Sequence, residues 1–170
     1  MNTKKLNIIF IILCVVISFP TICFANYFDD NPKRYLNYYS SEQYTCYADL
    51  DSVNVVRYNP PYYAIDITEY TIDYVNQATF ASLVRFYYNY DKQTMRFILI
   101  KAAPASSEDG TSKLDNVPIY FNTIYPSNIK TINNCPLAEK YSGNYLLGEI
   151  AFLKAYHMFF TKEYNNTAKN

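Results

Sequence analysis

The side chains that could most readily take part in catalysis or metal binding are one histidine and a pair of aspartates. His157 is the only histidine among 170 residues, which gives little support to a hydrolytic triad or a histidine-rich metal site. Asp49 and Asp51 alternate along a predicted strand and face the same side. No glycine-containing ligand loop accompanies them, so a solvated strand end is favoured over a cation site. We therefore predict no catalytic residue, no metal and no cofactor, with an enzyme of unrecognised type as an alternative.

The first 25 residues have the pattern of a secretory signal peptide. Lys4 and Lys5 precede an apolar stretch at 6–22, and Cys23-Phe24-Ala25 then places small side chains where a signal peptidase requires them. The stretch is slightly short for a membrane-spanning helix, so cleavage before Asn26 is favoured over an uncleaved anchor. We predict an exported protein that is periplasmic, on the cell surface or extracellular.

Charge and composition limit the classes of partner. The chain has 15 basic and 15 acidic residues, and loss of Lys4 and Lys5 would leave a slight negative charge. Nucleic acid is excluded because its recognition requires clustered positive charge. No polybasic run favours a membrane surface after signal cleavage. The 20 tyrosines suit a contact surface, but tyrosine is also a good strand former. The tyrosine count alone therefore does not identify a binding protein.

Two cysteines, Cys46 and Cys135, follow the predicted signal peptide. In an oxidising compartment such a pair is expected to form a disulfide. The loop that it closes is long, so the cross-link would stabilise the fold by about 4–5 kcal/mol. No C-x-x-C spacing indicates a redox site. Two separate thiols are the alternative.

From Gln43 onward the residue pattern is that of an antiparallel sheet. Pro60-Pro61 interrupts it because proline cannot donate to a strand ladder. In the longest strand the apolar positions change phase near Thr68-Glu69. Either a β-bulge there or a strand that crosses from one packed face to another explains this change. The strands are expected at 44–49, 53–57, 62–75, 80–90, 95–102 and 117–124, with a turn at 91–94.

The C-terminal part changes to helical spacing. Leu146, Ile150 and Leu153 mark an apolar stripe within a helix expected at 145–161, and Asn144 is the expected N-cap. The predicted fold is therefore α+β, an antiparallel sheet of five or six strands with a C-terminal helix packed on one face. The expected organisation is a signal peptide at 1–25, a flexible N-terminal arm at 26–42, a single α+β domain at 43–163 and a polar tail at 164–170.

Several stretches resemble the surface-adhesin protein E-like family of small exported bacterial proteins. They are Tyr47-Ala48-Asp49-Leu50-Asp51-Ser52-Val53, the strand through Tyr70-Thr71-Ile72-Asp73-Tyr74, and the hairpin from Tyr87 to Phe97. The resemblance extends from about Tyr44 to Phe160, although this chain lacks tryptophan and inserts Pro60-Pro61. Adhesins of this type are antiparallel sheets with a C-terminal helix, and some bind host matrix or serum proteins. The resemblance implies a non-enzymatic surface or secreted protein.

A helix on one face of the sheet leaves the other face partly solvated. In the predicted phase this other face carries Tyr62, Arg85, Tyr87 and Asn89, and tyrosine and arginine are typical of contact surfaces. We therefore predict an exported, adhesin-like binding module that contacts an envelope or host-matrix protein. The alternative is a structural envelope domain that forms a homodimer through the same face or through a sheet edge.

Overall fold

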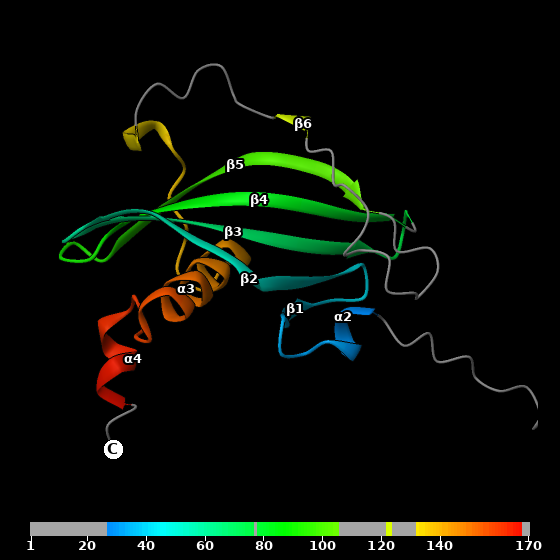
Figure 1. The fold of residues 1–170 in the computed structure, drawn as a ribbon, viewed down its shortest axis with the longest axis horizontal. Coiled ribbons are helices and arrows are strands. Elements are labelled where there is room, and N and C mark those ends of the chain that lie inside the picture. The colour runs from blue at the N-terminus through cyan, green and yellow to red at the C-terminus, as the bar shows by residue number, and fades with distance from the viewer. Residues whose placement is uncertain (1–26, 77, 106–121, 124–131, 168–170) are drawn as a thin grey trace, which may run out of the picture.

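The computed structural model describes residues 27–76, 78–105, 122–123 and 132–167. At its centre is a six-stranded antiparallel sheet whose strands follow one another in chain order (Figure 1). The strands are β1 (Tyr35–Ser40), β2 (Tyr44–Asn59), β3 (Tyr62–Asp73), β4 (Ala78–Asn89), β5 (Thr94–Ala105) and β6 (Asn122–Thr123). The helix α3 (Gly143–Tyr156) packs on one face, so the predicted α+β fold is confirmed.

Parts of the sequence prediction lie outside the described residues. These parts are the signal peptide at 1–25 and most of the strand expected at 117–124, of which only β6 is described. Among the described residues, no helix has both the length and the apolar character needed to cross a membrane.

The central strand β3 contributes to two separate hydrophobic cores. It pairs with β4 without a register shift, whereas its pairing with β2 shifts between Thr68 and Asp66, where the extra residues lie on β2. The bulge expected near Thr68-Glu69 is therefore not on β3 itself. The alternative, a strand that serves two packed faces, is confirmed. Ile65 and Ile67 pack in the core beneath α3, whereas Tyr70 belongs to an aromatic cluster on the opposite face, here called the second face. The apolar phase changes because the large apolar side chains pack beneath α3 at Ile65 and Ile67 but on the second face at Tyr70, while residues 64–68 are buried on both faces.

Local chemistry fixes both the start and the position of α3. The Ser142 hydroxyl accepts a hydrogen bond from the Tyr145 backbone N–H at 3.2 Å, so Ser142 rather than Asn144 is the N-cap. Gly148 allows the helix to approach the sheet closely, because a Cβ atom there would lie 2.2 Å from the Met95 sulfur. The buried stripe is turned from the predicted one, since Leu146 is 36% exposed. Its fully or largely buried side chains are Tyr145, Leu147, Glu149, Ala151 and Phe152.

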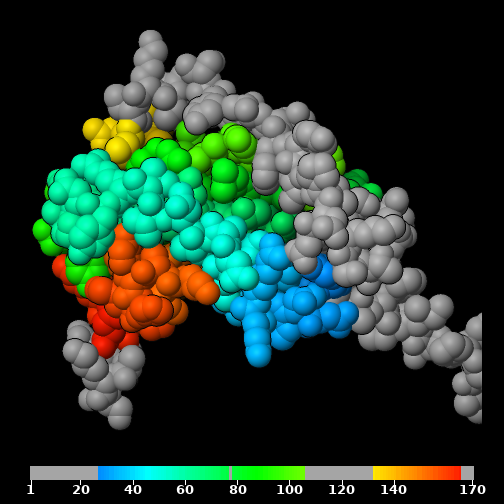
Figure 2. Space-filling view, in the orientation of Figure 1, coloured from blue at the N-terminus to red at the C-terminus, as the bar shows by residue number. Residues whose placement is uncertain are grey.

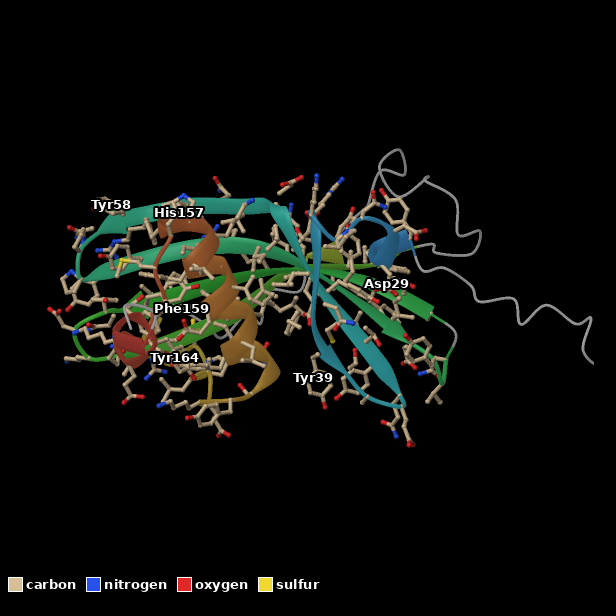
Figure 3. All side chains as sticks on the ribbon, turned by 90° about the horizontal axis from the view of Figure 1, so that it is seen from below. Asp29, Tyr39, Tyr58, His157, Phe159 and Tyr164 are labelled. Atoms are coloured by element: carbon tan, nitrogen blue, oxygen red, sulfur yellow. The ribbon has the colours of Figure 1, made fainter. Side chains whose placement is uncertain are left out.

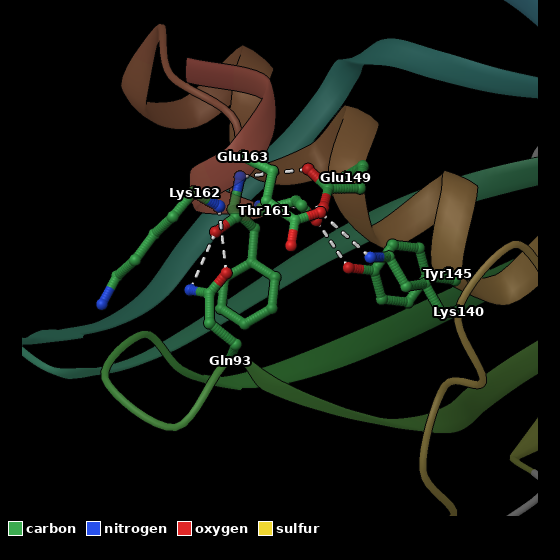
Figure 4. A network of polar contacts seen from close by, with 8 residues as sticks. Gln93, Lys140, Tyr145, Glu149, Thr161, Lys162 and Glu163 are labelled. Atoms are coloured by element: carbon green, nitrogen blue, oxygen red, sulfur yellow. Dashed lines mark hydrogen bonds and ion pairs between the residues drawn. The ribbon is translucent and has the colours of Figure 1, made fainter. Parts of the chain in front are cut away.

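A buried carboxylate holds the C-terminal segment against α3 (Figure 4). Glu149 accepts hydrogen bonds from the backbone N–H groups of Phe160 at 3.0 Å and Thr161 at 2.9 Å, and from the Thr161 hydroxyl. The Gln93 side-chain amide donates to the Phe160 carbonyl at 3.1 Å and accepts from the Lys162 N–H at 3.0 Å. The short helix α4 (Lys162–Thr167) is therefore tied to α3 and to the β4–β5 turn.

The segment predicted as a flexible arm at 26–42 instead forms the helix α2 (Tyr27–Asp30) and β1. Phe28 is fully buried on the second face, where its ring lies 4.9 Å from that of Tyr47 and 5.0 Å from those of Tyr35 and Tyr70. Aromatic rings of this size contribute large buried areas. The arm prediction is wrong because a single buried phenylalanine anchors a segment that has no regular period of its own.

The expected disulfide between Cys46 and Cys135 is absent, and both are free thiols. Cys46 lies on β2 and contacts Thr71, whereas Cys135 packs on the second face against Ile98 and Ile100 of β5. Two strands separate β2 from β5, and adjacent strands are about 4.8 Å apart. A disulfide requires Cα atoms within about 7 Å of each other. The alternative of two separate thiols is the one that the fold allows.

Replacement of Phe28 tests whether α2 is part of the folded domain. We expect Phe28→Ala to lower the free energy of unfolding by about 3 kcal/mol, because the substitution empties a packed aromatic site. Urea denaturation followed by circular dichroism measures this loss. Phe80, which is 40% exposed, is the matched control, and its alanine variant should lose about 1 kcal/mol. Equal losses in the two variants would contradict the docking of α2.

Alkylation tests the state of the two cysteines. Burial raises the pKa of the Cys46 thiol to about 11, and burial also raises that of Cys135. Because the thiolate is the reactive form, both should react slowly with iodoacetamide at mildly alkaline pH in the folded protein. The rate at Cys46 should rise as the pH approaches about 11. After unfolding without reductant, mass spectrometry should find both positions alkylated; a cross-linked Cys46–Cys135 peptide would refute this arrangement.

Candidate binding site

Three of the four residues predicted to form a binding face lie together. Tyr62 at the start of β3 pairs directly with Asn89 at the end of β4, and Tyr87 pairs with Ala64 two residues further along β3. Directly paired residues and residues two apart point to the same side of a sheet, here the second face. Tyr62 is 47% exposed, and Tyr87 and Asn89 are partly exposed. These three side chains line one cleft.

Arg85, the fourth predicted residue, is held within the sheet. Its guanidinium donates two hydrogen bonds to the Asp66 carboxylate, at 2.7 and 2.9 Å, across the β3–β4 pair. These hydrogen bonds raise the pKa of Arg85 above its usual range. A bidentate pair of this kind fixes both side chains. Arg85 therefore positions the strands beside the cleft and does not line it.

The cleft has a volume of about 320 Å³ and lies at the end of the sheet where the β2–β3 and β4–β5 turns meet. Its floor is the second face, and its wall is the segment that begins with the short 3₁₀ helix η1 (Ile132–Asn134). In the space-filling view this yellow segment lies beside the teal side chains of the β2–β3 hairpin (Figure 2). Ile132 and Leu137 give the wall an apolar surface, and both are at least 43% exposed.

Hydrogen bonds fasten this wall to the edge of β5. The Phe97 N–H donates to the Pro136 carbonyl at 3.1 Å, and the Ala138 N–H donates to the Met95 carbonyl at 2.9 Å. The Arg96 guanidinium also donates to the Cys135 carbonyl. The wall thus pairs with β5 much as a further strand would, and the cleft is a built feature of the fold.

A β-bulge in β2 places Arg57 in the cleft. Val55 pairs with Ile65, but the next residue of β3, Ala64, pairs with Arg57, so Val56 is an extra residue. The alternation of faces is therefore reset, and Arg57 lies on the same face as Ala64 and the cleft. The Arg57 guanidinium sits over the Tyr62 ring, 5.9 Å from the ring centre. This contact orients the cation toward the cleft.

Among the described residues that line the cleft are three cations, Arg57, Lys92 and Arg96, and no carboxylate. The ion pairs of the described residues all involve other cations, namely Arg34, Arg85 and Lys140. Asp91 precedes Lys92 in the β4–β5 turn but does not line the cleft. Like charges that lack a counter-charge attract an anion. The site therefore combines tyrosine rings, an apolar wall and a positive potential.

Asp49, Asp51 and His157, the candidates for catalysis or metal binding, lie outside the cleft. Asp49 is buried and accepts two hydrogen bonds of 3.1 Å from the Arg34 guanidinium, so it joins β2 to the start of β1. Asp51 follows it on β2 and is exposed. His157 is exposed and ends α3 with a left-handed φ of 56°. Figure 3 shows His157 near Tyr58, at the end of the molecule where the β2–β3 hairpin lies.

The three cations were missed because sequence reasoning considered the strands and neglected their ends. Arg57 precedes the Pro60-Pro61 turn and Lys92 lies in the 91–94 turn, and the antiparallel order of the strands brings these two turns to the same end of the sheet. The order of the strands could therefore have predicted that these cations lie close together. The wall at 132–137 had no comparable signal, because a short polar turn gives no indication of the strand edge that it covers.

No protein-family model matches this chain, and neither the curated proteins nor the solved structures give a significant match. The resemblance to the surface-adhesin protein E-like family stays a prediction. The function of the protein must therefore be inferred from the geometry and charge of the cleft.

Proposed function

We propose that this protein is an exported, non-enzymatic binding module that contacts another protein through the cleft. The observation that carries the proposal is the conjunction of exposed and partly exposed tyrosine rings with three cations and, among the described lining residues, no carboxylate. Tyrosine and arginine are the residues that most often supply binding energy at protein interfaces. The partner is an envelope or host-matrix protein, in agreement with the adhesin-like resemblance.

The arrangement favours recognition over bond chemistry. The described residues that line the cleft are tyrosine, arginine, lysine, asparagine, threonine and aliphatic side chains, and neither His157 nor a buried carboxylate lies among these described residues. An active site typically holds an acid or base with a strongly shifted pKa in the concave surface. The cleft instead offers hydrogen-bond donors, positive charge and ring faces, which suit an anionic partner surface.

Self-association of an envelope domain is the second candidate, and an open strand edge on β2 favours it. β1 pairs with β2 only as far as Asp49, so the rest of β2 has a neighbour on one side alone within the described part of the chain. Open edges are common sites of dimerisation. Sedimentation at the concentrations used for partner capture separates the two functions, because the binding-module proposal expects a monomer.

Capture by tyrosine variants tests the proposed function. The immobilised protein is exposed to a panel of purified matrix proteins and to envelope fractions, and each captured partner is identified and titrated. We expect Tyr87→Ala to weaken the affinity about 30-fold, because loss of an interface tyrosine costs about 2 kcal/mol. Tyr141→Ala is the control, since Tyr141 is 70% exposed and lies outside the cleft. Equal capture by the two variants would remove the cleft from the interface.

A further inference from the structure

One edge of the sheet is covered by another segment of the chain beside the cleft, whereas the other edge is open within the described residues. On the β5 side, residues 136–138 hydrogen-bond to the backbone of Met95 and Phe97 and so cover the edge beside the cleft. On the β2 side, the last hydrogen bond from the β1 end runs from the Leu50 N–H to the Arg34 carbonyl at 2.8 Å. Beyond it, β2 continues as the outer strand of a hairpin (Figure 1). Within the described residues, 51–59 therefore have no strand on their outer side.

This open edge has little of the usual protection. All residues from Asn54 to Asn59 are exposed, and Val55 and Val56 are each 42% exposed. Natural proteins shield edge strands with lysine, proline or a covering segment. Here proline occurs only after Asn59, and Arg57 is the single charged residue of the stretch. The bulge at Val56 interrupts the edge, but it also directs Arg57 into the cleft.

The two faces beside this edge differ in chemistry. On the cleft face lies Arg57, with Tyr62 beneath it and Lys92 across the cleft. On the α3 face lie Val55 and Tyr58, and the Tyr58 ring is 5.8 Å from that of Tyr156. Side chains of an added strand alternate between the two faces. A matching strand would therefore turn acidic side chains toward the cleft and apolar side chains toward α3.

We propose that an extended segment of the partner, in which acidic and apolar residues alternate, adds as a strand along Asn54–Asn59 and directs its carboxylates to Arg57. This inference rests on the proposed binding function and names the chemistry of the ligand. The main-chain N–H and C=O groups of the open edge supply pairing to any extended peptide. The Arg57 guanidinium and the apolar α3 face supply the preference for this pattern.

A peptide fits these observations better than a sulfated glycan or a second copy of the chain. A polyanionic glycan makes no use of a strand edge, and the 15 acidic residues balance the 15 basic ones. Antiparallel pairing of two β2 edges over 54–59 would bring two Arg57 side chains close together without an acidic residue in either stretch. Like charges on neighbouring strands are unfavourable. The acidic partner strand removes that repulsion.

Fluorescence anisotropy with a labelled peptide tests the inference on the full chain. The probe is a short acetylated peptide in which glutamate alternates with valine, and its matched control has the same composition with the glutamates and valines in separate blocks. We expect the alternating peptide to bind at least tenfold more tightly than the block peptide, and to weaken as salt is raised. N-methylation of the amides along one edge of the peptide should abolish binding, because it removes main-chain donors.

Charge-reversal variants locate the bound peptide. Arg57→Glu should weaken binding at least tenfold, whereas Lys154→Glu, on an exposed position of α3, should leave it unchanged. Circular dichroism confirms that each variant is folded.

Equal binding of the block or N-methylated peptide would overturn strand addition. Binding of a heparin fragment but not of the peptide, or an Arg57-dependent dimer, would also overturn the inference. If Tyr87-dependent capture persists in any of these cases, the proposed function stands with a different ligand.

Discussion

The arrangement of this protein depends on one constraint, which is that β3 must bury side chains on both of its faces at different points along its length. Ile65 and Ile67 face the core beneath α3, and Tyr70 faces the aromatic cluster around Phe28. A single helix cannot cover both sets. The chain therefore covers the second face with α2 at one end of β3, and the turn end of that face is left available for the cleft.

The charged side chains of the described residues serve two separate roles. The buried carboxylates join elements: Asp49 is paired with Arg34, Asp66 is paired with Arg85, and Glu149 accepts hydrogen bonds from the backbone of the C-terminal segment. Each of these carboxylates is held by directed donors, as buried charges require. The three cations of the cleft have no such role in the sheet, apart from the contact of Arg96 with the wall. Their charge is therefore directed toward solvent and toward whatever enters the cleft.

The strands β3, β4 and β5, the two main turns and the C-terminal helix followed from sequence because each has a local signal. Alternating apolar residues marked β3, β4 and β5, and helical spacing marked α3. The N-terminal arm was mispredicted because Phe28 acts through long-range packing that no local period reveals. The disulfide was mispredicted because compartment and cysteine count say nothing of which face of a sheet each cysteine occupies. Arg85 was taken for a contact residue because its pairing with Asp66 depends on strand register.

The bulge at Val56 connects the fold to the function that we propose. Regular pairing continued from Asn54 and Val55 would have placed the Arg57 side chain on the α3 face, away from Tyr62. The extra residue instead adds a cation to the cleft and, at the same position, leaves an edge whose two faces differ in polarity. β-Bulges often re-aim side chains next to functional sites at the edges of sheets. Since one irregularity produces both features, a partner that matches one of them is already aligned with the other, and selectivity for an alternating acidic strand follows from the geometry of β2 itself.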